Sequence, residues 1–227
     1  MWIVCAYFTK NTSYEEHVKN LVNSLEQFNL PHEITSVDNR GNWYANTQYK
    51  PTFLKQMLEK HYPYSVIYVD ADAIFCRYPE YFNKLDQEQN VDIAVYILDH
   101  SRYQRKNRAP EMLSGTIFLK NTATTKQIVE EWIQECRKDP KIWDQRALDA
   151  VLKHHRYHLL PEEYCTIFDY MASVKNPVIK HFQASRESRS RKGGSGNRKP
   201  RQNVSTSKPR RRVVQNGIVR IRRANLK

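Results

Sequence analysis

The sequence contains no run of apolar residues long enough to cross a membrane, and its first residues, MWIVCAYF, have neither a preceding basic segment nor a small-residue cleavage site. A membrane-spanning helix needs about 18 or more apolar residues, and a secretory signal needs both of those flanks. Only four cysteines are present, without a CxxC pair or a Cys/His group at zinc spacing. These absences argue against a disulfide framework and a zinc module, so we expect free thiols and a cytoplasmic protein.

Positive charge is distributed unevenly along the chain. The net charge is +13, but residues 186–227 hold fifteen Lys/Arg and one acid, whereas residues 1–183 hold 22 basic and 23 acidic side chains. This asymmetry predicts a nearly neutral domain over residues 1–183 and a basic tail over residues 184–227. The Ser/Gly/Arg-rich start of the tail is expected to be disordered. Near its end, Asn216-Gly217 between two β-branched runs predicts a short hairpin that orders on a partner.

Apolar runs and helical periodicities alternate through the first 183 residues. Trp2–Phe8 and Ser65–Val69 are continuous apolar runs typical of strands buried on both faces. Further strands are expected over residues 33–37, 92–98, 114–120 and 178–182, and helices over residues 18–28, 52–61, 123–137 and 144–155. Alternating strands and helices predict an α/β sandwich with a mostly parallel central sheet.

Two carboxylates directly follow the apolar run Ser65–Val69. Asp70 and Asp72 stand at positions i and i+2, so their side chains point to the same side if the chain stays extended. They fall at the carboxyl end of a buried strand, where open α/β sheets bind ligands. Paired oxygen ligands suit Mg²⁺ or Mn²⁺ bound together with substrate phosphates. A bare Asp-x-Asp occurs by chance in many proteins, and its place after a buried strand is what makes it a candidate metal site.

Four segments, taken in order, resemble the GT-A nucleotide-sugar transferases, especially the glycogenin-like and related nucleotide-diphospho-sugar transferases. HYPYSVIYVDADAIF resembles their strand and DxD motif, and Tyr49-Lys50-Pro51 resembles the helix start that precedes it. Leu113-Ser114-Gly115 resembles the strand that lines the donor-sugar pocket, and Trp143-Asp144-Gln145 resembles the Asp-Gln motif of the next helix. The resemblance covers about residues 1–183. It implies the three-layer GT-A fold and transfer of a sugar from a nucleotide-diphosphate donor, with a UDP-sugar expected.

The resemblance also implies roles for individual residues. Mn²⁺ or Mg²⁺ would be held by Asp70, Asp72 and His181, and would neutralise charge on the departing nucleotide. The nucleotide and the donor sugar would be bound by a set drawn from the first strand, the helix start, the DxD turn and the Ser-Gly pair: Ala6, Tyr7, Thr9, Asn11, Lys50, Asp70, Ala71, Ser114 and Gly115. Asp144 and Gln145 are implied in acceptor activation or donor-sugar binding. Glycogenin-like relatives are retaining, which favours retention of the anomeric configuration.

Several of these residues have alternative structural roles. Lys50 can be a solvated lysine, Asp144 can cap the helix that follows it, and His181 can be a partly buried structural histidine. The sequence shows no unambiguous general base, because Asp99, Glu111 and Asp144 can all be placed near the acceptor.

The basic tail is expected to bind nucleic acid. Its Arg-rich segments match the electrostatic footprint of a nucleic-acid binder, although binding to an anionic membrane surface or simple solubilisation also explains the charge. Joined to a transferase, the tail suggests a modified DNA base as the acceptor, of the kind that phage-encoded enzymes glycosylate. The alternatives are a glycan, lipid or protein acceptor, and an inert GT-A scaffold that binds nucleic acid. A nucleotidyltransferase is disfavoured, because CAYFTKNTS is not a Gly/Lys-rich phosphate loop.

Overall fold

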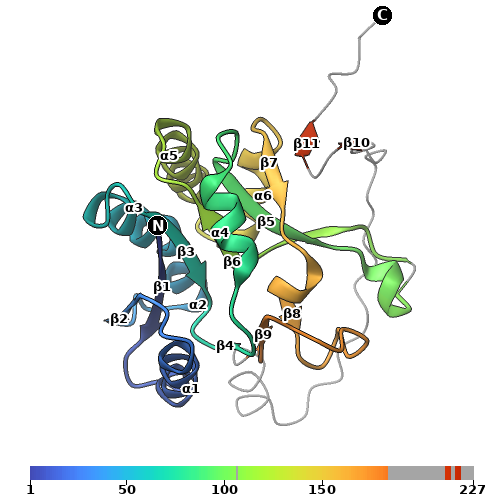
Figure 1. Ribbon diagram of the computed structural model, residues 1–227. Coiled ribbons are helices and arrows are strands. Elements are labelled where there is room, and N and C mark those ends of the chain that lie inside the picture. The colour runs from blue at the N-terminus through green and yellow to red at the C-terminus, as the bar shows by residue number, and fades with distance from the viewer. Residues whose placement is uncertain (106, 184–212, 216–217, 221–227) are drawn as a thin grey trace, which may run out of the picture.

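The computed structural model describes residues 1–105 and 107–183, and the backbone of residues 213–215 and 218–220. A sheet runs through the centre of the molecule (Figure 1), with the strand order β10-β11-β7-β5-β6-β3-β1-β2. In that order the strands are Val213–Gln215, Ile218–Arg220, Tyr157–Leu159, Ile93–Leu98, Glu111–Leu119, Ser65–Val69, Trp2–Thr9 and His32–Val37.

Most strands that residues 1–183 contribute to this sheet run in one direction. β1 pairs parallel with β2 and β3, and β5 pairs parallel with β7. Among these strands β6 alone is reversed, since it is antiparallel to both β3 and β5. The predicted mostly parallel sheet is therefore confirmed. The reversed strand matters for the site, because Thr116 in the middle of β6 lies opposite Val69 and the first residues of β6 extend past the end of β3.

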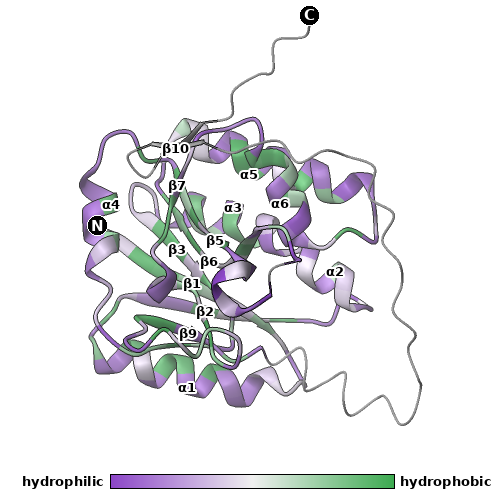
Figure 2. Cartoon of the chain, turned by 90° about the vertical axis from the view of Figure 1, so that its right-hand side faces the viewer, coloured by the Kyte–Doolittle hydropathy of each residue, from purple (hydrophilic) through white to green (hydrophobic). Residues whose placement is uncertain are grey.

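Helices cover both faces of the sheet, and β1 shows how its alternating side chains divide between them. Val4 and Ala6 belong to an apolar cluster shared with α1 (Tyr14–Gln27) and α4 (Glu80–Gln87). Cys5 and Tyr7 point the other way, into a second cluster with the remaining long helices: α3 (Lys50–Lys60), α5 (Ala123–Lys138) and α6 (Asp144–Leu152). Figure 2 shows the matching apolar and polar stripes along the helices. The predicted three-layer sandwich is confirmed.

A second, three-stranded sheet has the order β4-β9-β8. Its strands are Ala73–Phe75, Ile179–His181 and Thr166–Ile167. β4 follows β3 after a short turn and pairs antiparallel with β9, with Ala73 opposite His181. This pairing returns the chain near residue 181 to the Asp70–Asp72 turn. The sequence predicted a strand over residues 178–182 but neither of its two partners.

The predicted helices and strands agree with the structure apart from their ends and some omissions. The first helix begins at Tyr14, before its first apolar position, and the helix predicted over residues 144–155 ends at Leu152. The elements that sequence analysis did not find are short: α2 (Trp43–Gln48), β4, α4, β7, β8 and the 3-10 turns η1 (His100–Tyr103) and η2 (Glu162–Tyr164). Such short segments carry too little periodicity to be recognised.

Most of the basic tail lies outside the described residues, so its disorder and its boundary near residue 183 remain predictions. Two described fragments, β10 and β11, pair antiparallel with each other, and β11 also pairs with β7. The predicted turn Asn216-Gly217 between them lies outside the described residues.

The four cysteines are free thiols, as predicted. Burial raises the pKa of Cys5 and of Cys136 to about 12, which makes both thiols unreactive packing groups. Within the part of the chain that the structure describes, no helix combines the length and the apolar character needed to span a membrane.

Candidate active site

An open cleft of about 750 Å³ is formed where β1, β3 and the start of β6 meet the loop before α2 and the start of α6. Most of the residues predicted from the sequence line it: Tyr7, Thr9, Lys50, Asp70, Ala71, Asp72, Ser114, Gly115, Asp144, Gln145 and His181. Two predicted residues are not among the lining residues. Ala6 is fully buried in the apolar core on the other face of β1. Asn11 is exposed, and its backbone N–H donates to Glu15 Oε1 at 2.8 Å.

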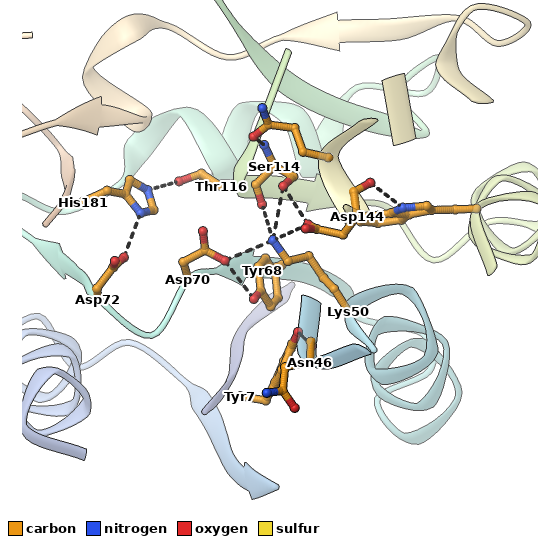
Figure 3. A network of polar contacts seen from close by, with 12 residues as sticks. Tyr7, Asn46, Lys50, Tyr68, Asp70, Asp72, Ser114, Thr116, Asp144 and His181 are labelled. Atoms are coloured by element: carbon orange, nitrogen blue, oxygen red, sulfur yellow. Dashed lines mark hydrogen bonds and ion pairs between the residues drawn. The ribbon is translucent and has the colours of Figure 1, made fainter. Parts of the chain in front are cut away.

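The three side chains predicted to hold a metal converge in this cleft (Figure 3). One ligand atom from each of Asp70, Asp72 and His181 lies within 4.8 Å of the other two. The turn after β3 is closed by a bond from the Ala73 N–H to the Asp70 carbonyl, 2.9 Å long. Beyond β9, the Phe182 N–H donates to the Asp72 carbonyl at 3.2 Å. The pairing of β4 with β9 therefore brings the histidine to the aspartates.

The two ring nitrogens of His181 have different surroundings. Its Nε2 lies 2.8 Å from Thr116 Oγ1, which fixes the plane of the ring. Its Nδ1 is buried without a hydrogen-bond partner and lies 3.7 Å from Asp72 Oδ1. Burial by itself lowers the pKa of His181. The opposing effect of Asp72 and Cys165 is larger and raises the pKa to about 10. A buried nitrogen that makes no hydrogen bond is costly, and a second contact that orients the ring is typical of metal-binding histidines. These residues fit a divalent cation.

Asp70 is held through one of its two oxygens. Its Oδ1 accepts hydrogen bonds from the Tyr68 hydroxyl at 2.9 Å and the Lys50 ammonium at 3.0 Å. Its Oδ2 lies toward Gly115, where an added Cβ would stand 3.2 Å from Oδ2 and 3.2 Å from His181 Cε1. Glycine therefore leaves room for the carboxylate and the imidazole to approach each other. Burial raises the pKa of Asp70, although the Lys50 charge opposes this effect.

Lys50 is buried between two carboxylates, so the alternative of a solvated lysine is wrong. Its ammonium lies 2.7 Å from Asp144 Oδ2 and 3.0 Å from Asp70 Oδ1, and it donates to the Ser114 carbonyl at 3.1 Å. Burial lowers the pKa of Lys50, but Asp144 and Asp70 raise it well above its ordinary value. The amine therefore stays charged and fixes the two carboxylates relative to each other.

Asp144 does not act as a helix cap. It is the first residue of α6, and Trp143 occupies the cap position without a side-chain capping bond. The Asp144 carboxylate instead contacts Lys50 and accepts from the Ser114 hydroxyl at 2.8 Å. Its backbone carbonyl accepts from the Trp132 indole at 2.8 Å. The start of α6 is thus anchored on the core while the carboxylate faces the cleft.

A second chain of contacts continues along the cleft. Gln145 accepts from the Ser114 N–H at 3.3 Å and donates to Glu111 Oε1 at 2.8 Å. Glu111 Oε2 lies 3.1 Å from His100 Nε2, and His100 Nδ1 lies 2.6 Å from the Tyr170 hydroxyl. All five residues line the cleft. A polar network therefore connects the Lys50 region with a separate end of the cleft.

Sequence analysis missed several residues of these networks. Tyr68 and Thr116 stand two residues away from Asp70 and Ser114, so strand alternation would have placed them on the same side. His100 and Tyr170 lie outside the regular strands, so strand alternation could not have predicted their place in the cleft. Asp99, one of the three acids considered as a base, is not among the cleft residues, and it accepts from the Ser101 N–H at 3.0 Å.

This three-layer α/β structure, with paired aspartates after a central strand and a histidine brought to them by a small second sheet, is the GT-A fold of glycosyltransferases. The chain belongs to the nucleotide-diphospho-sugar transferase family, whose model matches residues 18–201. No curated protein sequence matches the chain.

Several solved glycosyltransferases share the fold. A glycosyltransferase involved in glycosylation of the major capsid of PBCV-1 aligns with a TM-score of 0.63 and 15% identity, over 84% of this chain and 97% of its own. Mouse xyloside xylosyltransferase 1 gives 0.54 and 12%, over 81% and 98%. The galactosyltransferase LgtC, solved with donor and acceptor sugar analogues, gives 0.52 and 11%, over 81% and 87%. At these identities the likeness establishes the fold.

Proposed function

We propose that the protein is a metal-dependent glycosyltransferase that moves a sugar from a nucleotide-diphosphate donor, expected to be a UDP-sugar, to an acceptor hydroxyl. The observation that supports this most directly is the convergence of Asp70, Asp72 and His181 in the cleft. At about 750 Å³ the cleft is of the size that binds small-molecule ligands. An inert scaffold gains nothing from burying an aspartate beside an imidazole nitrogen that makes no hydrogen bond, because both cost folding energy.

Asp70, Asp72 and His181 would hold Mn²⁺ or Mg²⁺. When bound, the cation neutralises charge on the diphosphate as it departs. Asp70 would contribute Oδ2, because its Oδ1 is already used by Tyr68 and Lys50. His181 would contribute Nδ1, the ring nitrogen that makes no hydrogen bond and faces Asp72.

Lys50, Asp144 and Ser114 form the wall next to these ligands, and we assign this wall to the donor sugar. The ammonium that joins Asp70 to Asp144 keeps the metal-binding and sugar-binding groups at a fixed spacing, which is how an active site orients a bound substrate before reaction. The direct contact between Lys50 and a phosphate remains a prediction. Gln145, bonded to the Ser114 N–H, is assigned to the reaction centre beside that wall.

The end of β1 and the segment around α2 form the wall that we assign to the nucleoside. Tyr7 donates from its hydroxyl to the Asn46 carbonyl at 2.9 Å, and Thr9 also lines the cleft. Trp43 and Trp143 line the same cleft with ring centroids 5.6 Å apart. Aromatic rings beside a few fixed polar groups are typical of sites that bind a base and a ribose. Nucleotide contacts by Ala6, Asn11 and Ala71 remain predictions.

The class of acceptor and the stereochemistry remain predictions. A modified DNA base was suggested by the basic tail, and residues 184–212 lie outside the described part of the chain. Binding to an anionic membrane surface was suggested by the same tail residues and also remains a prediction. A glycan or protein acceptor has separate support, since one structural relative is described as involved in the glycosylation of a capsid and another as a xyloside xylosyltransferase. Retention of configuration rests on the resemblance to glycogenin-like enzymes.

Donor hydrolysis tests the proposed function. The full-length protein is incubated with Mn²⁺ and a panel of nucleotide sugars, alone and with hydroxymethylated DNA or simple glycosides, and the released nucleotide is measured. The matched variants are Asp72→Ala and Asp149→Ala, because Asp149 pairs with Lys153 at 3.5 Å and is not a cleft residue. We expect release that is lost only in Asp72→Ala. Stimulation by DNA or by a glycoside identifies the acceptor class. No release from any donor would leave the inert scaffold as the better hypothesis.

A further inference from the structure

We propose that Glu111 forms the acceptor subsite, where its carboxylate accepts the hydrogen bond of the acceptor hydroxyl. The inference rests on the proposed function and specifies the chemistry of the acceptor, an alcohol such as a sugar or polyol hydroxyl. A carboxylate accepts the hydrogen bond that a hydroxyl donates.

Elimination among the cleft carboxylates points to this residue. The described part of the cleft is lined by the carboxylates of Asp70, Asp72, Asp144 and Glu111. The first two belong to the metal trio. The Asp144 side chain is 7% exposed and its charge is neutralised by Lys50 at 2.7 Å. The Glu111 side chain is 32% exposed, so of the four it is the one outside the metal trio that is open to a visiting ligand.

The contacts of Glu111 hold it ready for such a ligand. Gln145 Nε2 donates to Oε1 at 2.8 Å, and His100 Nε2 lies 3.1 Å from Oε2. The His100 side chain is 3% exposed, and its other nitrogen contacts the Tyr170 hydroxyl at 2.6 Å. An ionised carboxylate has about four acceptor positions. These two contacts fix its orientation and leave positions for a hydroxyl, with Arg108 at 3.7 Å as a weaker neighbour.

The position of Glu111 relative to the donor wall supports the same assignment. A single side chain, Gln145, connects Glu111 to the Ser114 N–H, and the Ser114 hydroxyl contacts Asp144. A hydroxyl bound at Glu111 therefore lies next to the residues assigned to the donor sugar. Leu98 stands opposite Glu111 in the β5–β6 pair and also lines the cleft, which gives this end an apolar surface beside its polar groups. Such a mixture suits the face and the edge of a sugar.

The contact with Gln145 gives Glu111 a second role in positioning. Because the Gln145 amide nitrogen donates to Glu111, its oxygen is turned toward the Ser114 N–H and the cleft. Loss of the carboxylate would release this amide, so the acceptor site and the orientation of Gln145 depend on the same residue.

Hydrolysis of the donor tests the proposal without a known acceptor, since water is the smallest hydroxyl compound. The full-length protein is assayed with Mn²⁺ and a nucleotide sugar that the wild type hydrolyses. Glu111→Gln is compared with Glu130→Gln, because Glu130 pairs with Lys55 at 2.9 Å and is not a cleft residue. We expect kcat to fall about 10–100-fold in Glu111→Gln, the loss typical of a hydrogen bond to a charged group. The donor KM and the affinity for Mn²⁺ with UDP should stay within about twofold in both variants.

A second variant separates loss of the carboxylate from general damage. Glu111→Ala should be slow, and added formate should restore part of its hydrolysis rate, which a purely structural role would not allow. A kcat within about threefold of wild type in Glu111→Gln, or a slow Glu111→Ala that formate does not rescue, would overturn the assignment and leave the proposed function intact. A wild-type protein that neither binds Mn²⁺ with UDP nor hydrolyses any donor would instead overturn the proposed function, and this inference with it.

Discussion

Replacing Tyr68 by phenylalanine removes one hydroxyl that orients Asp70, a proposed metal ligand. That hydroxyl donates to Asp70 Oδ1 at 2.9 Å, and Lys50 donates to the same oxygen at 3.0 Å. Together they leave Oδ2 facing Gly115 and His181. Tyr68 is therefore a positioning residue that acts on the cation through Asp70. We expect Tyr68→Phe to weaken Mn²⁺ binding while the fold is retained, because the ring and its packing stay in place.

The size of the effect follows from the contacts that remain. A hydrogen bond to a charged group contributes about 1.5–3 kcal/mol. Lys50 still holds Oδ1 in the variant, so only part of the orientation is lost. Loss of a contact that orients a metal ligand usually weakens metal binding about 10–100-fold. We expect the lower end of that range, about tenfold, which corresponds to about 1.4 kcal/mol.

Mn²⁺ binding in the presence of UDP can be followed by electron paramagnetic resonance of free Mn²⁺, together with thermal unfolding of each variant. Tyr62→Phe is the matched control, because Tyr62 is 67% exposed and is not a cleft residue. A Tyr68→Phe protein that melts like the wild type and binds Mn²⁺ within about twofold of it would refute the positioning role.

Two further outcomes follow from the structure. Gly115→Ala should weaken Mn²⁺ binding about tenfold with little change in thermal unfolding. The reason is that the added Cβ would stand 3.2 Å from Asp70 Oδ2 and 3.2 Å from His181 Cε1. Unchanged binding would show that the space left by the glycine is not needed for the metal. Burial by itself raises the pKa of Glu33. The opposing effect of Lys60 and His61 is larger, so the pKa in the folded protein lies below the ordinary value. Its contribution to stability is therefore present above the unfolded pKa and lost as the pH falls through the folded value. Glu33→Gln should reduce the unfolding free energy at pH 7 by less than about 1 kcal/mol, and urea titrations should show this difference shrink as the pH falls below the unfolded pKa and vanish below the folded one. A difference that persists at low pH would contradict the linkage.

The sequence predicted most of the central sheet because the relevant signals are local. The run Ser65–Val69 is apolar throughout, and it forms a strand buried along its whole length. The helix over residues 123–137 was recognised from its spacing and is Ala123–Lys138 in the structure. Asp70 and Asp72 could be singled out because they follow such a strand at alternating positions. Side-chain periodicity is written into consecutive residues, so these features need no knowledge of distant parts of the chain.

Contacts within the site depend on segments far apart in the sequence. His181 was assigned to the metal by resemblance alone. Its approach to Asp72 results from the pairing of β4 with β9, of which only β9 was predicted. Lys50 was expected to be near a phosphate or in solvent, whereas the fold buries it between Asp70 and Asp144. No pattern within a single segment specifies such a charge pairing, because the residues next to each partner in the sequence do not indicate what it will contact.

The sequence by itself thus determined the layers of the fold, the strand that the two aspartates follow and the family to which the chain is similar. Only the tertiary structure decided which oxygen of Asp70 faces the histidine, which amine neutralises Asp144, and that Glu111 lies open in the cleft while Asp99 lies outside it. The physical reason is the same in each case. Periodicity and propensity act between neighbours along the chain, whereas a site is assembled by packing and hydrogen bonds between segments whose separation carries no local signal.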